Sequence, residues 1–71
     1  MADSVYRVTE VIGTSTEGWE AAARSAVQTA AQSIRDLRIA EATRFDVTIQ
    51  DGEVAEYRVR LDISFKYEAG D

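Results

Sequence analysis

One stretch of the sequence, EYRVRLDISFKYE over residues 56–68, alternates strictly between apolar and polar side chains. Every odd position from Tyr57 to Tyr67 is apolar, and every even position between them is polar or charged. Because a β-strand sends successive side chains to opposite faces, this pattern predicts a strand with one face in a core and one charged face. The charged face carries Arg58, Arg60, Asp62, Ser64 and Lys66.

Two further strands and one helix are expected. Residues 4–12, SVYRVTEVI, are rich in β-branched residues and predict a first strand that Gly13 ends. Residues 18–37 are rich in alanine, contain no proline and predict the helix. Residues 38–50 predict the second strand, and Asp51–Gly52 after it is a strong signal for a hairpin into the strand of the opening stretch.

Four local details are also expected. GTSTEG, residues 13–18, predicts a strand-to-helix turn in which Thr14 and Glu17 have the spacing of a capping box. The apolar positions of the second strand change parity, which predicts a β-bulge near Thr43–Arg44. Trp19, at the start of the helix, is expected to pack in a core or against another subunit rather than to contact a ligand. The helix has one thin apolar stripe made of Trp19, Ala23, Ala26, Val27, Ala30, Ile34 and Leu37.

The element order is β-α-β-β, which predicts an α+β fold in a single domain over residues 1–71. A right-handed crossover through the helix leaves room for the last strand between the first two, so the expected sheet is antiparallel with strand order 1-3-2. One helix covers only one face of such a sheet. Val5, Val11 and Ile39 then have no partner inside the chain, which predicts an oligomer that uses sheet faces and edges.

The composition excludes several classes of function. The chain has no cysteine and no histidine, so it has no disulfide, no thiolate or imidazole metal site and no Ser-His or Cys-His pair. A net charge of −5 argues against nucleic-acid binding. No apolar run reaches the roughly 20 residues of a membrane span, and the N-terminal residues do not resemble a signal peptide, so the expected location is cytoplasmic.

Three segments together resemble the dodecins, a family of small β-α-β-β proteins. These are VYRVTEVIGTS (residues 5–15), SIRDLR at the end of the helical segment (33–38) and YRVRLDISFKYE (57–68). The expected subunit is a three-stranded sheet partly wrapped around one helix, and the resemblance implies that twelve subunits form a hollow homo-dodecamer that stores a small ligand in the cytoplasm. In most members this ligand is a flavin such as FMN or riboflavin, bound in pairs between subunits.

The sequence departs from the flavin-type pattern at both ligand contacts. In the flavin-type family motif, a tryptophan lies just after the helix and shortly before an acidic residue of the second strand. The corresponding residues of this chain are Arg38-Ile39-Ala40-Glu41, so Ile39 occupies the tryptophan position. The family's glutamine is replaced by Arg58. Stacking on an aromatic ring is worth about 1–3 kcal/mol per base-like ring, so the replacements predict much weaker flavin binding. The resemblance implies that Ile39, Arg58, Glu41 and Arg38 line the flavin site.

A branch of the family lacks the tryptophan, has Tyr-Arg on the last strand as here, and is associated with calcium. This resemblance implies a second reading, a calcium-binding or purely structural dodecameric cage. Calcium takes six to eight oxygen ligands, and the candidates are Asp62, Asp46 and Glu56, with Glu41. The alternative interpretation is that these carboxylates pair with arginines of neighbouring strands, namely Arg44, Arg58 and Arg60.

An enzyme is the least supported reading. Glu41, Arg58 and Asp62 are chemically able to form an acid–base site, but no spacing in the sequence requires one. The expected activity is therefore binding or storage of a small ligand, without catalysis.

Overall fold

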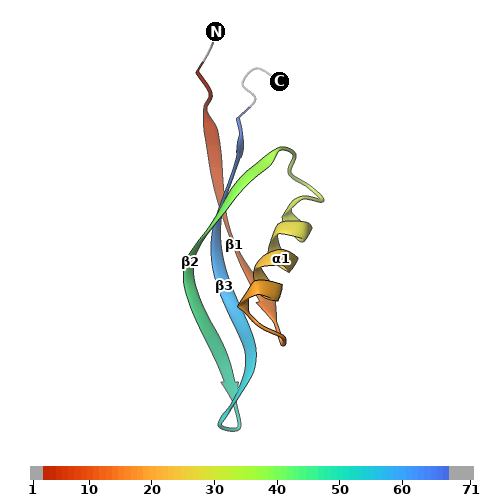
Figure 1. The fold of residues 1–71 in the computed structure, drawn as a ribbon, viewed down its shortest axis with the longest axis vertical. Helices are drawn as coiled ribbons and strands as arrows, with labels where there is room; N and C mark the ends of the chain where they lie inside the picture. Colours follow the sequence, from red (N-terminus) through yellow and green to blue (C-terminus); the bar gives the residue numbers. More distant parts are fainter. Residues whose placement is uncertain (1–2, 68–71) are drawn as a thin grey trace.

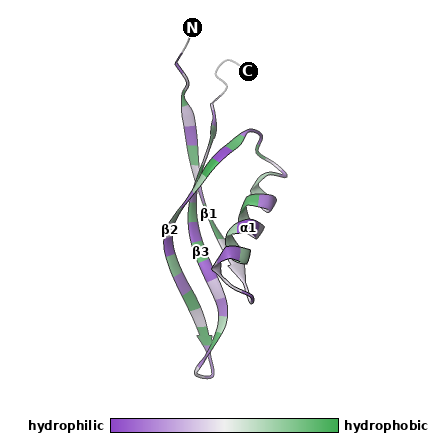
Figure 2. Ribbon diagram, viewed as in Figure 1, coloured by the Kyte–Doolittle hydropathy of each residue, from purple (hydrophilic) through white to green (hydrophobic). Residues whose placement is uncertain are grey.

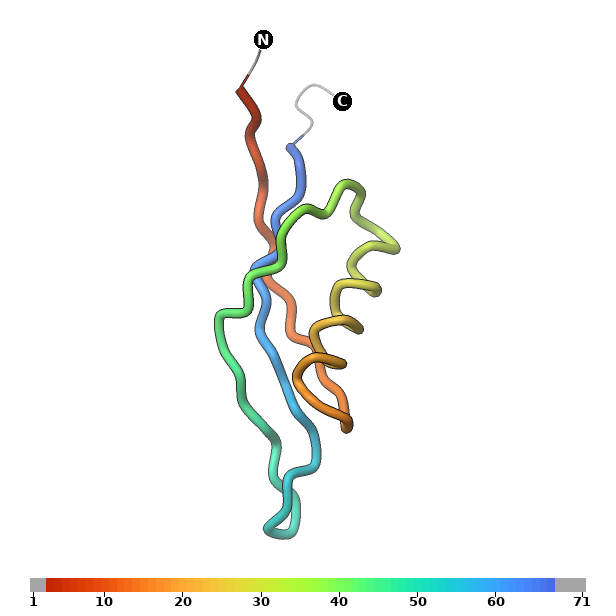
Figure 3. The backbone as a smooth tube through the Cα atoms, in the orientation of Figure 1, coloured from red at the N-terminus to blue at the C-terminus, as the bar shows by residue number. Residues whose placement is uncertain are grey.

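The computed structural model describes residues 3–67. It contains strand β1 (Tyr6–Ser15), helix α1 (Trp19–Ala30), strand β2 (Leu37–Gln50) and strand β3 (Glu53–Lys66). The three strands form one antiparallel sheet in the order β1-β3-β2, with α1 on one face (Figures 1 and 3). The expected β-α-β-β fold and strand order are confirmed.

The core lies between the middle of β3 and α1. Val59, Leu61 and Ile63 are almost fully buried, and their neighbours on the even positions of β3 are not. This is the alternation that the sequence predicted, and Figure 2 shows the corresponding alternation of hydropathy along the strands. Three alanines spaced four residues apart form the buried stripe of the helix: Ala22, Ala26 and Ala30.

The stripe differs in part from the predicted one. Ala22 is fully buried although it was not placed on the stripe, whereas Trp19 retains 40% of its surface. Ala23, Val27 and Leu37 pack only partly against the core. The helix lies so close to the sheet that methyl groups, rather than larger side chains, make the contact.

Gly13 permits this close approach, and the prediction that it ends the first strand was wrong. Gly13 lies inside β1, opposite Val59, and is buried. A Cβ atom at this position would lie 2.2 Å from the carbonyl oxygen of Ala22 and 2.8 Å from the Cβ of Ala26. Because Gly13 has no side chain, the helix can pack directly against β1 at this position. The strand continues to Ser15.

The helix is shorter than predicted at its C-terminal end. It ends at Ala30 instead of residue 37, and the next amides of Gln32 and Ser33 bond to carbonyls three residues back. Asp36 then adopts a positive φ of 62°, which turns the chain into β2. The helix ends early because Leu37 has to enter the sheet beside Phe65.

The helix also starts without the predicted capping box. Its N-cap is Gly18, which has no side chain that could cap the helix. The predicted capping box of Thr14 and Glu17 was therefore wrong, because both residues lie before the N-cap. The hydroxyl of Ser15 instead accepts a hydrogen bond from the amide of Glu17 at 3.0 Å. This bond closes the turn between β1 and the helix.

The hairpin and the bulge are where the sequence placed them. Asp51 and Gly52 both have positive φ angles, 54° and 79°, as a type I′ turn requires. The β2–β3 register shifts between Ala42 and Arg44, and the hydroxyl of Thr43 donates to the Arg60 carbonyl at 3.3 Å. The shift exchanges the two faces of β2 beyond the bulge, so that Phe45 pairs with Val59 on the helix side.

The molecule is elongated, with extents of 56 × 20 × 16 Å. The tip of the β2–β3 hairpin extends past α1 (Figure 1). Within residues 3–67, helix α1 is neither long enough nor apolar enough to cross a membrane.

Candidate functional site

The sheet face away from α1 is the candidate site. Over the described residues no element covers it, and we call it the open face. Residues that pair across an antiparallel sheet project to the same side, so the register defines rows across this face. From one end to the other the rows are Val8–Ser64–Ile39, Glu10–Asp62–Glu41, Ile12–Arg60–Arg44 and Thr14–Arg58–Asp46.

The first and third rows expose apolar side chains. Val8 keeps 63% of its surface, Ile39 keeps 67% and Ile12 keeps 50%. The partner residues between them are polar or charged. The open face therefore carries exposed apolar side chains among charged ones, whereas a sheet face that contacts only water is mainly polar.

The three apolar residues that the sequence left without a partner in the chain differ in their burial. Ile39 and Val5 are exposed, as expected for residues without a partner in the chain. Val11 was wrongly placed with them, because it pairs with Leu61 on the helix side and packs against the core.

Asp46 and Arg58 form the best-defined polar contact of the open face. Arg58 donates from Nε to Oδ1 at 2.8 Å and from Nη2 to Oδ2 at 3.0 Å, so the pair is bidentate. Each side chain keeps 40% of its surface. The hydrogen bonds from Arg58 hold the pKa of the Asp46 carboxyl below its usual value, and they raise the pKa of Arg58.

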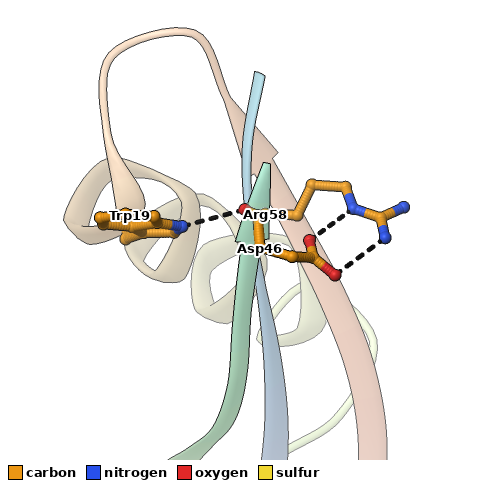
Figure 4. Close-up of polar contacts among 3 residues, drawn as sticks. All are labelled: Trp19, Asp46 and Arg58. Atoms are coloured by element: carbon orange, nitrogen blue, oxygen red, sulfur yellow. Dashed lines mark hydrogen bonds and ion pairs between the residues drawn. The ribbon is translucent and has the colours of Figure 1, made fainter. Parts of the chain in front are cut away.

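Asp46 is also held from the other side of the sheet. The indole Nε1 of Trp19 donates to the backbone carbonyl of Asp46 at 3.0 Å. Figure 4 shows the indole on one side of β2 and the Arg58 guanidinium on the other. The Trp19 ring meets Phe45 and Tyr57 edge to face, with centroids 5.9 Å and 5.2 Å apart. Trp19 thus packs within its own subunit, and it links the helix start to the strand that carries Asp46.

The structure brings only some of the predicted ligand residues together. Glu41 lies directly opposite Asp62, and Glu10 lies on the other side of Asp62. Ile39 and Arg58 share the open face, but their rows are six residues apart along β3, or about 20 Å. The fused ring of one flavin does not span that distance, so the two residues of one chain do not contact the same ring.

The remaining two predicted residues lie apart from these rows. Arg38 falls in the irregular step of the β2–β3 register between Leu37 and Ile39, and it is exposed. Glu56 pairs with Thr48, toward the hairpin.

The predicted calcium ligands do not converge within one chain. Over residues 3–67, no three carboxylates come close enough together to hold a metal ion. Asp46 is occupied by Arg58, which supports the alternative interpretation for that residue. Glu10, which the sequence analysis did not single out, approaches Arg60 with Oε2 3.9 Å from Nε.

A shallow groove of about 370 Å³ lies between β1 and α1. Its lining is small and weakly polar: Val11, Ile12, Gly13, Thr14, Ser25, Ala26, Thr29, Ala30, Ser33 and Ile34. It carries no charged side chain, and its polar side chains are the hydroxyls of Thr14, Ser25, Thr29 and Ser33.

The comparisons with known proteins identify the family. The dodecin family model matches residues 5–68. The chain belongs to the dodecin family. Calcium dodecin from Mycobacterium tuberculosis is 43% identical over 63 residues, which is 89% of each chain.

Solved dodecin structures agree. Dodecin from Streptomyces coelicolor superposes with a TM-score of 0.92 at 43% identity, covering 99% of this chain and all of that one. A structure of the calcium dodecin from Mycobacterium tuberculosis, described as calcium chelating with a novel calcium-binding site, gives a TM-score of 0.82 at 40% identity over 96% and 97% of the two chains.

Sequence reasoning missed two features of this dodecin's open face and one contact that supports it from the helix side. It did not place Glu10 beside Asp62, the indole of Trp19 on Asp46, or Arg44 opposite Arg60. The spacing of two or four residues does put Glu10 on the same strand face as Tyr6, Val8 and Ile12. The exact strand register, which depends on the bulge at Thr43, was needed to bring the other pairs together.

Proposed function

We propose that this dodecin is a binding and storage protein for a small ligand, not an enzyme, and that it works as a homo-dodecamer. The observation that carries the proposal is the open face, where exposed Val8, Ile12 and Ile39 stand among charged side chains. Apolar groups exposed on a flat sheet face gain stability when a second surface covers them. Further copies of the chain supply that surface in our proposal.

The ligand site lies between copies. Ile39 and Arg58 are about 20 Å apart along one sheet. A flavin that contacts both kinds of residue must therefore take Ile39 from one copy and Arg58 from another. This geometry supports an inter-subunit pocket rather than a pocket within one chain.

The proposed ligand is a flavin, FMN or riboflavin, held without an aromatic sandwich. Ile39 supplies an apolar wall for the ring, and the third guanidinium nitrogen of Arg58, Nη1, stays available for a carbonyl oxygen. Glu41 and Arg38 neighbour Ile39 in sequence and contribute polar groups beside it. We propose that the chain is of the type without the stacking tryptophan, since the Trp19 indole lies on the helix side of the sheet.

The second candidate is a calcium-binding cage. The row Glu10–Asp62–Glu41 and the 43% identity to a protein named calcium dodecin favour it. Because no three carboxylates of one chain converge over residues 3–67, a calcium ion would need oxygens from more than one copy. Asp62 and Glu41 fit that role better than Asp46, whose two oxygens are bonded to Arg58.

A flavin titration with a gain-of-function variant tests the proposal. We expect the wild type to quench riboflavin and FMN fluorescence weakly, and Ile39→Trp to bind both at least about tenfold more tightly, because the ring gains a stacking partner. Ile49→Trp is the matched control, since Ile49 is 69% exposed but lies near the hairpin tip. Equal behaviour of the two variants would contradict a flavin site at Ile39.

Calcium is tested on the same samples. Native mass spectra in calcium and in chelator should show the same assembly if flavin storage is correct. A dodecamer that forms only with calcium, and that Asp62→Asn prevents, would favour the cage instead.

A further inference from the structure

Three arginines lie in two adjacent rows of the open face, beside one carboxylate that is bonded at both of its oxygens. Arg58 bonds both oxygens of Asp46, at 2.8 Å and 3.0 Å. Arg44 and Arg60 pair directly with each other in the next row, and both act on the Asp46 carboxylate through their charge. Glu10 is the other carboxylate nearby, and its contact with Arg60 is long, at 3.9 Å.

This arrangement has the chemistry of an anion site. A guanidinium that presents Nε and one Nη in parallel matches carboxylate and phosphate oxygens equally well. Two like charges directly opposite across a sheet are unfavourable, so the Arg44–Arg60 pair is stabilised by an anion beside it. Asp46 supplies that anion from within the chain.

Asp46 is fixed where an external anion would otherwise bind. Its backbone carbonyl accepts the indole hydrogen of Trp19 on the helix side, while its carboxylate faces the guanidinium on the open face (Figure 4). Arg58 and Asp46 each remain 40% exposed within one chain, so both side chains face the space between copies in which the proposed ligand lies. To bind there, the anion has to displace a carboxylate that is already held in a bidentate geometry.

We propose that Asp46 is a specificity determinant that excludes phosphate-bearing ligands from an anion site formed by Arg58, Arg44 and Arg60. The carboxylate neutralises the guanidinium of Arg58 and occupies its two parallel donors. Removing its charge leaves the positive charges of the three arginines without that neutralising carboxylate. The consequence for ligand choice, a preference for the phosphate-free flavin riboflavin over FMN, rests on the proposed function.

The direct test uses inorganic pyrophosphate, which contains no flavin ring. Isothermal titration compares the wild type with Asp46→Asn, which keeps the shape of the side chain and removes its charge. The matched control is Glu53→Gln, with the same charge change at the exposed first residue of β3. Circular dichroism verifies that all variants are folded.

We expect Asp46→Asn to bind pyrophosphate at least about tenfold more tightly than both the wild type and Glu53→Gln, since hydrogen bonds to charged groups are the strong ones. Adding Arg58→Gln to Asp46→Asn should remove the gain. Equal affinities in the first three proteins would overturn the proposal. An equal gain in Glu53→Gln would also overturn it, because the effect would then be one of net charge.

Parallel titrations with riboflavin and FMN separate the two proposals. The ratio of FMN to riboflavin affinity should rise about tenfold in Asp46→Asn. A gain for pyrophosphate without flavin binding in any variant would contradict the flavin function and uphold the exclusion by Asp46. If flavin binds, but Asp46→Asn changes neither the pyrophosphate affinity nor the ratio of FMN to riboflavin affinity, the exclusion by Asp46 is overturned and the flavin function stands.

Discussion

Replacing Gly13 by alanine tests the close contact between the helix and the sheet. The added Cβ would lie 2.2 Å from the Ala22 carbonyl oxygen and 2.8 Å from the Ala26 Cβ. An ordinary carbon–oxygen contact is about 3.3 Å, so the helix would have to retreat by about 1 Å. The clash is with backbone, which cannot rotate away as a flexible side chain would.

The expected loss of stability follows from two opposing terms. Overpacking of this kind costs about 1–3 kcal/mol, and the involvement of a helix carbonyl places Gly13→Ala near the upper end. Removing a glycine from a strand returns about 0.5–1 kcal/mol of conformational entropy. We therefore expect the free energy of unfolding to fall by about 2 kcal/mol, and further for Gly13→Val.

Urea titration followed by fluorescence of Trp19, the single tryptophan, measures this change. The subunit concentration has to be held constant, because assembly makes apparent stability depend on it. The valine variant makes the result decisive, since valine has high strand propensity. Unchanged or increased stability of Gly13→Val would refute the steric reasoning, because propensity alone predicts that outcome.

Three further changes have defined outcomes. Leu61→Ala, at a site that is 2% exposed, should lower the free energy of unfolding by about 2–5 kcal/mol in the same titration, and a loss below 1 kcal/mol would contradict its place in the core. Trp19→Phe keeps a ring but loses the bond to the Asp46 carbonyl, and circular dichroism should show a loss of about 1 kcal/mol. The pKa of Asp46 is lowered below 3.8 by Arg58, so its pairing stabilises the fold above that pH and is lost as the pH falls through the folded-state pKa. Thermal unfolding from pH 7 into acid should therefore show wild type above Asp46→Asn near neutrality, with the difference shrinking once the pH falls below the ordinary pKa of an aspartate; a constant difference would argue against the ion pair.

The sequence predicted those parts of the fold that depend on local patterns. Strict alternation placed β3 at the centre, Asp51–Gly52 defined the turn, and the change of parity before Phe45 located the bulge. These signals are local because each depends on neighbouring residues of one strand.

The errors came from tertiary contacts that outweighed local preference. Gly13 resembles a strand breaker in sequence, but it stays in β1 because the helix passes over it. Helical propensity continues beyond Ala30, yet the chain has to turn so that Leu37 joins the sheet. The candidate site could be predicted only in part for the same reason. The partners of Arg58 and Asp62 depend on the strand register, which the one inserted residue of the bulge shifts.

The central claim is that the open face is covered by further copies of the chain, with a small ligand between them. A native mass spectrum of the protein, recorded after incubation with riboflavin, tests both parts at once. The account predicts a mass of twelve chains with added riboflavin, and an assembly that persists in chelator. A monomer with its open face exposed to water would contradict it.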